Sequence, residues 1–207
     1  MSALTYKQNV KNHTVSCWLK VSGVVLISFI LTGCISNIWT GASLVYDRHN
    51  IYLKLNDFQL AAKISRSLYR DKLLKRDDCS IEIAVFNLDV LMVGHVPTDA
   101  LRREADSRIK AVAGYRRFFN QLALSNTQED PLLDSWITTK IRGDILADSS
   151  IDPHHFKIVT ADQIVYLMGD VIPEQAKQVI LYARQCQGVK RVVKLFKYYN
   201  LSDKAAN

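Results

Sequence analysis

Apolar positions follow two different periods along the chain, and their order predicts a compact unit of helices and strands. From Phe58 to Leu73, apolar residues recur about every four positions, as on the buried side of an amphipathic helix. Ile81, Ile83 and Val85 alternate with Glu82 and Ala84, as in a half-buried strand, and a second strand at Val90–Val96 follows a short turn, so a hairpin is predicted at Ile81–Phe86 and Val90–Val96. A second helix is expected from Thr98 to Ala113, followed by a last strand from Arg116 to Ala123.

The same order of elements is predicted a second time, further along the chain. A helix begins near Leu133, a hairpin follows at Phe156–Thr160 and Ile164–Gly169, a second helix starts at Pro173, and a last strand covers Val192–Tyr199. The two copies lie about 75 residues apart, and a repeat of that length is typical of two tandem domains rather than of a solenoid. The sequence therefore predicts an α+β protein of two αββαβ domains, each a small three-stranded sheet packed on two helices.

Matches between single residues of the two halves support this repeat. Asp57 is matched by Asp134 at an offset of 77 positions, and apolar residues follow each aspartate at the same spacing. The predicted boundaries are 56–124 for the first domain and 130–200 for the second, with a short polar linker between them.

The first 33 residues have the pattern of a bacterial lipoprotein signal peptide. Three lysines and no acidic residue accompany an apolar run, Val21–Leu31, that is too short for a comfortable membrane-spanning helix. The run ends in a lipobox, Leu31-Thr32-Gly33-Cys34, whose small residues let the peptidase approach the backbone. The Cys34 thiol is the nucleophile that accepts the diacylglyceryl group. An uncleaved anchor that continues through Trp39 is the alternative, although polar residues dilute that run.

The residue that follows Cys34 bears on where the lipoprotein is delivered. By resemblance to enterobacterial lipoproteins, an aspartate at this position retains a protein in the inner membrane. The chain has Ile35 instead, which implies export to the outer membrane, where acyl chains on Cys34 hold the protein on the periplasmic face. We therefore expect a signal peptide at 1–33 and a lipidated tether at 34–55.

Two cysteines, Cys79 and Cys186, remain in the expected mature chain besides Cys34. The periplasm permits a disulfide, but these two residues lie in different halves of the chain. The sequence leaves open whether they pair or stay as free thiols.

Composition and motifs exclude several classes of protein. The 207 residues are 23% charged and 48% hydrophobic, as in ordinary globular proteins. The net charge of +7 falls to +4 without the first 33 residues, too small an excess to indicate nucleic-acid binding. No GxSxG, HExxH, Walker A or GxGxxG motif occurs, and the adjacent His154 and His155 would point to opposite faces of a strand. We expect no enzymatic activity, no cofactor and no metal.

Four glycines at matched positions suggest a family. Gly94 and Gly169 lie between the second strand and the second helix of each half, and Gly114 and Gly188 close that helix. With the double αββαβ pattern, these glycines resemble the BON domain. A lipobox followed by two such units is the layout of the dual BON-domain outer-membrane lipoproteins.

This resemblance implies a non-enzymatic lipoprotein on the periplasmic face of the outer membrane. Proteins of this kind support envelope integrity and bind anionic phospholipid through the second BON domain, so the implied partners are anionic phospholipids and the outer membrane. The alternative is an adaptor lipoprotein that binds protein partners in an outer-membrane assembly or secretion complex.

The residues that favour lipid binding lie on the first helix of the second domain. Trp136 lies about 100° to one side of the buried position Ile137, and Leu146 lies on the face opposite the buried stripe. An exposed indole beside Lys140 and Arg142 suits an anionic membrane surface. Alternatively, the indole covers small residues such as Gly143 or seals a contact between the domains.

Net charge alone would favour the first domain for binding to an anionic surface. Residues 51–125 carry 13 basic and 9 acidic side chains, whereas 126–200 carry 9 of each. Six basic residues of the first domain form either a second contact surface or a solvated helix face: Arg102, Arg103, Arg108, Lys110, Arg116 and Arg117.

Overall fold

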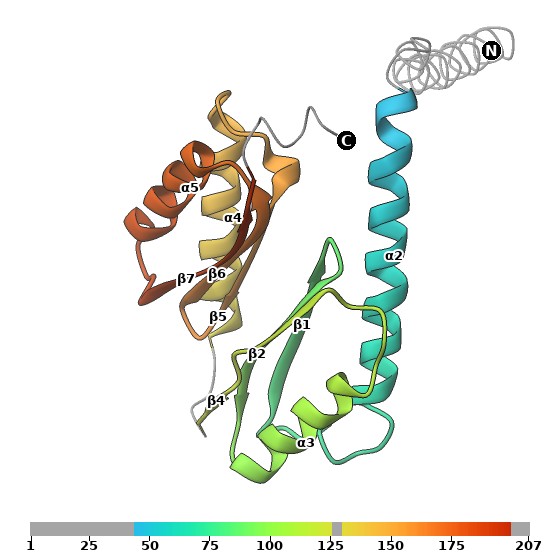
Figure 1. Ribbon diagram of the computed structural model, residues 1–207. Helices are drawn as coiled ribbons and strands as arrows, with labels where there is room; N and C mark the ends of the chain where they lie inside the picture. Colours follow the sequence, from blue (N-terminus) through green and yellow to red (C-terminus); the bar gives the residue numbers. More distant parts are fainter. Residues whose placement is uncertain (1–43, 126–129, 200–207) are drawn as a thin grey trace, which may run out of the picture. The chain divides into compact units, whose positions relative to one another are not determined.

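The computed structural model describes residues 44–125 and 130–199 (Figure 1). The predicted signal peptide, Cys34 and the first part of the predicted tether lie outside the described residues. From His49 onward, the chain belongs to one compact unit that includes both predicted domains. Within the described ranges, no helix combines the length and the hydropathy that a membrane span requires.

The first domain places two helices beside a mixed sheet. Its elements are α2 (Leu44–Leu68), β1 (Ser80–Phe86), β2 (Asp89–Val96), α3 (Asp99–Lys110), β3 (Arg117–Asn120) and β4 (Ala123–Leu124). Strand β1 is antiparallel to β2, and β3 and β4 pair with β2 in parallel. The parallel pairing is possible because α3 forms the crossover between β2 and β3.

The second domain repeats this arrangement. Its elements are α4 (Pro131–Ala147), the short 3-10 helix η1 (Pro153–His155), β5 (Phe156–Ala161), β6 (Ile164–Val171), α5 (Pro173–Gln185) and β7 (Arg191–Tyr198). The central strand β6 is antiparallel to β5 and parallel to β7. Each domain is thus an αββαβ unit around a central second strand, as the sequence predicted.

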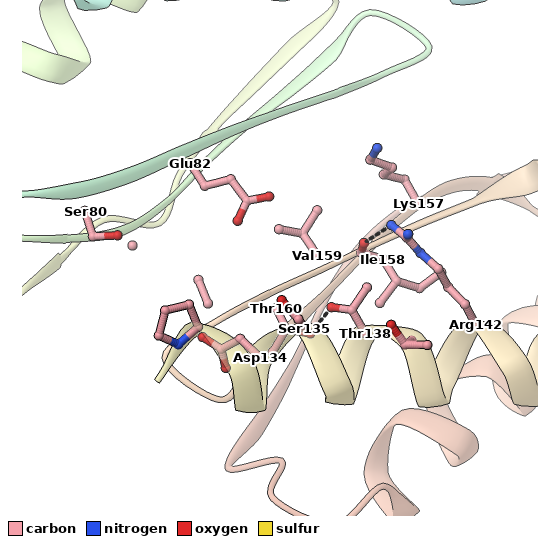
Figure 2. A pocket seen from close by; sticks show the side chains of 14 residues that line it. Ser80, Glu82, Asp134, Ser135, Thr138, Arg142, Lys157, Ile158, Val159 and Thr160 are labelled. Carbon is pink, nitrogen blue, oxygen red and sulfur yellow. Dashed lines mark hydrogen bonds between the residues drawn. The ribbon is translucent and has the colours of Figure 1, made fainter. Parts of the chain in front are cut away.

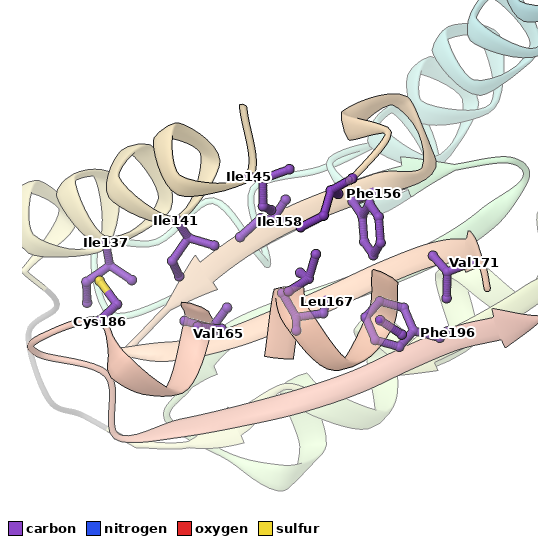
Figure 3. Packing of buried hydrophobic residues seen from close by; sticks show 14 residues of the cluster. Ile137, Ile141, Ile145, Phe156, Ile158, Val165, Leu167, Val171, Cys186 and Phe196 are labelled. Atoms are coloured by element: carbon purple, nitrogen blue, oxygen red, sulfur yellow. The ribbon is translucent and has the colours of Figure 1, made fainter. Parts of the chain in front are cut away.

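Each sheet buries one face against the helices of its own domain. In the second domain, Ile141 of α4 lies over the sheet residues Val165 and Leu167 (Figure 3). In the first domain, Ile64 of α2 and Ile109 of α3 belong to the equivalent apolar cluster. The two clusters share no residue, so each domain has a hydrophobic core of its own.

Helix α2 departs most from its predicted bounds. It spans Leu44–Leu68, whereas the apolar period predicted 58–73, so it begins earlier and ends earlier. Beyond its end, Arg108 Nη1 donates to the carbonyl oxygen of Leu68 at 2.7 Å. The carboxylate of Asp71 accepts a backbone N–H two residues further on at 2.9 Å, which forms a local turn. These bonds satisfy backbone groups that a longer helix would have paired.

The predicted last strand of the first domain is divided into β3 and β4. The side-chain oxygen of Asn120 accepts the backbone N–H of Leu122 at 3.1 Å, and this turn interrupts the strand. Gln121 still donates its N–H to the carbonyl oxygen of Met92 at 2.8 Å, so the segment stays beside β2.

Asp57 and Asp134, matched by the sequence repeat, have the same structural task. The Asp57 carboxylate accepts the backbone N–H groups of Asn87 and Leu88, each at 2.8 Å. Asp134 accepts those of the two residues at the matching turn, also at 2.8 Å. Both residues of each turn have positive φ, so each first helix fixes a strained hairpin turn of its own domain.

Two of the predicted glycines lie where a side chain has no room. A Cβ at Gly94, where φ is +103°, would overlap the carbonyl oxygen of Ser80, and a Cβ at Gly169 would overlap that of His155. Gly94 and Gly169 both pair with the start of the preceding strand, which brings two backbones close together. The close approach of the two strands in each domain therefore requires glycine at these two positions.

Each sheet has a second face that the helices do not cover, and these two faces contribute residues to a third apolar cluster. It contains Ala84, Leu91, Val93, Val159, Ala161, Tyr166, Met168 and Leu195, which come from both domains. At the ends of this cluster, His95 Nδ1 lies 3.3 Å from Asp162 Oδ2, and Asn87 Nδ2 donates to Asp170 Oδ2 at 3.1 Å.

The two polar pairs use equivalent positions of the repeat. At the offset of 75 positions that relates the central strands, His95 corresponds to Asp170 and Asn87 to Asp162. The roles of the two domains are therefore exchanged between the two pairs, as in the interface of a two-fold symmetric dimer. The internal repeat extends to the way in which its two copies contact each other.

Candidate membrane-contacting surface

Helix α4 is held in place by three isoleucines along one side. Ile137, Ile141 and Ile145 recur at four-residue spacing and are buried in the core of the second domain. The helix begins at Pro131, a favourable first residue. The Asp130 carboxylate caps it by accepting a backbone N–H of the first turn at 3.1 Å.

The opposite side of α4 also carries large apolar side chains, and these are exposed. Leu132 is 82% exposed, Trp136 48% and Leu146 70%. At about 100° per residue, the three fall within about 80° of one another, on the side turned away from Ile141. We call this surface the α4 stripe. It contains both of the apolar residues that the sequence indicated, Trp136 and Leu146.

Leu132 was missed by the sequence analysis because the helix was expected to start near Leu133. The true first residue, Pro131, adds Leu132 one turn before Trp136. A proline at the first helical position, preceded by a capping aspartate, is a signal that could have found it.

The indole of Trp136 does not cover the glycine that faces the same side. No atom lies within 4 Å of the place where a Cβ on Gly143 would stand. Trp136 also does not belong to the apolar cluster that joins the two sheets. The α4 stripe is therefore apolar surface that the described residues leave exposed to solvent, an arrangement typical of a contact site.

The two basic residues expected beside the indole have different environments. Lys140 Nζ is 2.7 Å from Asp144 Oδ2, one turn along the same helix, so most of its charge is offset locally. Arg142 Nη2 donates to the carbonyl oxygen of Ile158 at 3.1 Å and has no carboxylate partner among the described residues. Arg142 is therefore the stronger of the two candidates for contact with an anion.

Arg142 also borders a polar hollow of about 340 Å³ beside α4 (Figure 2). The hydroxyls of Thr138 and Thr160 lie 2.8 Å apart in its lining, and Lys157 contributes a second cation. Glu82 of β1 lines the same hollow. The hydroxyls and cations of this lining can donate hydrogen bonds to the oxygens of an anionic group.

Most of the basic residues of the first domain are engaged in ion pairs. Arg108 is buried and donates to the carboxylates of Asp71 and Glu104. The other pairs join Arg102 and Arg103 to Asp99, Lys110 to Asp106, and Arg116 and Arg117 to Asp89. Arg103 and Lys110 are exposed on α3, as expected of a solvated helix face, whereas Arg108 departs from that expectation because it is buried.

Asp89 lies in a particularly strong electrostatic environment. Burial by itself would raise its pKa, but hydrogen bonds from Arg116 and Arg117 outweigh burial and hold the pKa below its usual value. Arg116 reaches further and donates to Asp170 Oδ1 of the second domain at 2.8 Å. These arginines therefore stabilise the contact between the two sheets.

Cys79 and Cys186 are free thiols in different cores. Burial raises the pKa of both thiols, which disfavours the reactive thiolate. Within residues 44–125 and 130–199, no three His, Cys, Asp or Glu side chains are grouped closely enough to hold a metal ion.

Comparison with known proteins identifies the class of this fold. The model of the BON domain matches residues 56–126 and 133–200, so the chain belongs to the BON domain family with two copies of the domain. The family that the glycines and the double repeat suggested is thereby confirmed.

The relatives of the chain include a named outer-membrane lipoprotein. The chain is 26% identical over 191 residues to the outer membrane lipoprotein DolP of Haemophilus influenzae, a match that covers 89% of this chain and 98% of the relative. It is 28% identical to a 21 kDa hemolysin of Actinobacillus pleuropneumoniae, over 70% of this chain and 75% of the relative. It is 27% identical to the osmotically-inducible protein Y of Escherichia coli, over 67% and 70% of the two chains.

Proposed function

We propose that the protein is a non-enzymatic lipoprotein, lipidated on Cys34, that supports the outer membrane and contacts anionic phospholipid through the α4 stripe. The similarity to an outer membrane lipoprotein over nearly its whole length supports the location. The single observation that carries the lipid contact is the second apolar side of α4, with three large side chains exposed opposite a complete buried side.

The energetics of such a contact favour the apolar side chains over the charges. Burial of a leucine-sized side chain contributes about 1.5–3 kcal/mol, and a basic residue near an anionic membrane contributes about 1 kcal/mol. Lys140 is already offset by Asp144, so Arg142 supplies most of the electrostatic attraction. Binding through the α4 stripe is therefore expected to fall only modestly as salt is raised.

Vesicle flotation tests the proposal with a matched pair of variants. The chain from residue 34 onward, with Cys34→Ser so that it carries no lipid, would be mixed with phosphatidylglycerol vesicles. Leu146→Ser should reduce the floated fraction several-fold, because an exposed apolar contact is lost. Leu181→Ser, which changes an exposed leucine on α5, serves as the control and should float like the parent.

Two results would contradict the proposal. Equal loss in both leucine variants would mean that flotation does not depend on the α4 stripe. Failure of the parent to float, together with stable co-purification of other envelope proteins, would favour the adaptor function, in which the BON surfaces bind protein.

A further inference from the structure

Helix α2, like α4, has an exposed apolar side, and one of its residues occupies the position of a residue of the α4 stripe. At the offset of 77 positions, the buried residues Leu60, Ile64 and Leu68 of α2 match the three buried isoleucines of α4. Leu55 then matches Leu132 and, like it, points away from the core, with 49% of its surface exposed. Phe58, one turn further on, is 72% exposed.

The apolar pair on α2 is surrounded by basic side chains. Lys54, Lys63 and Arg66 are exposed on the same helix, and none of them forms an ion pair with a residue that the structure describes. The acidic residue among them, Asp57, is turned toward the hairpin of its own domain, where both carboxylate oxygens accept backbone N–H groups. An exposed phenylalanine and leucine among uncompensated cations is the pattern of a surface that lies on an anionic membrane.

We propose that α2 is a second lipid-contacting surface, in which Leu55 and Phe58 enter the headgroup region of the bilayer and Lys54, Lys63 and Arg66 meet anionic headgroups. This inference rests on the proposed function, because it takes the membrane as the one to which Cys34 is anchored. The α2 surface differs from the α4 stripe in its chemistry: its cations are uncompensated, so charge contributes more to its binding.

The position of α2 in the chain favours a membrane as its partner. The helix begins at Leu44, ten residues after Cys34. Ten residues span at most about 35 Å when fully extended, so a lipidated Cys34 keeps the start of α2 close to the bilayer. Such tethering raises the effective concentration of the membrane at this surface, and a weak intrinsic affinity is then sufficient for contact.

Spin-label accessibility can test the α2 surface in the full lipidated protein. The protein would be reconstituted in vesicles of phosphatidylglycerol and phosphatidylcholine, with Cys79→Ala and Cys186→Ala to leave one labelling site at a time. Labels would be attached at Phe58→Cys, at Leu146→Cys in the α4 stripe, and at Leu181→Cys as the solvent reference. Relaxation by oxygen, which concentrates in the bilayer, would be compared with relaxation by a water-soluble nickel chelate.

The α2 proposal expects stronger relaxation by oxygen than by nickel at position 58, and the reverse at position 181. If the label at 58 is relaxed mainly by nickel, as in water, while the label at 146 is relaxed mainly by oxygen, as in lipid, the proposal for α2 is wrong and the proposed function stands. Water-like labels at both positions would overturn both proposals.

A charge reversal tests the part assigned to the lysines. Lys54→Glu with Lys63→Glu, in the protein labelled at 58, should abolish the preference for oxygen at that site. Both lysines are exposed, so the fold should tolerate these changes. An undiminished preference for oxygen in this variant would overturn the role of the cations.

Discussion

At the scale of single residues, the repeat marks positions that build the fold. Asp57 and Asp134 could be paired from the sequence, because both precede apolar residues at the same spacing. Their task could not be predicted, since each carboxylate binds turn residues about thirty positions away in the chain. The buried Arg108 was likewise indistinguishable from its exposed neighbours, because its partner Asp71 lies on a different segment.

Removal of one turn-capping carboxylate should destabilise its domain. Asp134→Ala leaves two backbone N–H groups of a strained turn without their acceptor, and we expect a loss of about 1–3 kcal/mol in the free energy of unfolding. Urea denaturation measures this loss. Asp144→Ala, which removes a carboxylate from the exposed pair with Lys140, is the control and should cost less than about 1 kcal/mol. Equal costs would contradict the capping role.

The pairing of Asp89 with Arg116 and Arg117 predicts a specific response to acid. Because its pKa is held below the ordinary value of about 4, the unfolded chain binds the proton more readily than the folded chain. This stabilisation is complete above about pH 4 and is lost as the pH falls through the folded pKa. Asp89→Asn should therefore be less stable at neutral pH and lose less stability between about pH 4 and pH 2. An unchanged acid limb of the stability curve would contradict this account.

At the scale of elements, α4 carries two apolar sides, one buried in the core and one exposed to solvent. The side with Ile137, Ile141 and Ile145 was predicted, because core helices have this period. The second side was only partly predictable, since its residues Trp136 and Leu146 are ten positions apart and Leu132 lay outside the expected helix. The C-terminal end of α2 was missed because a hydrogen bond from Arg108, on a different segment, satisfies the carbonyl oxygen of Leu68 there.

A methyl group on the exposed side of α4 can distinguish a lipid from a protein partner. Gly143→Ala should raise the free energy of unfolding by up to about 1 kcal/mol, because alanine favours the helix and nothing obstructs its Cβ. A fluid membrane surface accommodates one more methyl group, so flotation with phosphatidylglycerol vesicles should be unchanged. Loss of flotation despite higher stability would indicate a close-fitting contact at the glycine instead.

At the scale of the whole described molecule, the two domains belong to one compact unit. The sequence indicated two similar domains but not their contact, because an apolar run such as Val90–Val93 does not reveal what covers its second face. That face belongs to the cluster shared by the two sheets, and the polar pairs His95–Asp162 and Asn87–Asp170 lie at its ends. The contact between the two repeated domains thus resembles the interface of a two-fold symmetric dimer within a single chain.

This shared cluster predicts cooperative unfolding of the two domains. Thermal unfolding should occur in a single transition, followed alike by far-ultraviolet circular dichroism and by calorimetry. Leu91→Ala, which truncates a fully buried residue of the cluster, should cost about 2–5 kcal/mol and separate the transitions of the two domains. Two separate transitions already in the parent protein would contradict the coupling.

The most direct test of the lipid contact is the fluorescence of Trp136 itself. Three tryptophans occur in the chain, and Trp18 is lost with the predicted signal peptide, so Trp39→Phe leaves Trp136 as the single emitter from residue 34 onward. Addition of phosphatidylglycerol vesicles should shift its emission to shorter wavelength, and brominated acyl chains should quench it, because the indole enters the headgroup region. Protein that floats with these vesicles while its Trp136 emission stays unshifted and unquenched would contradict the account.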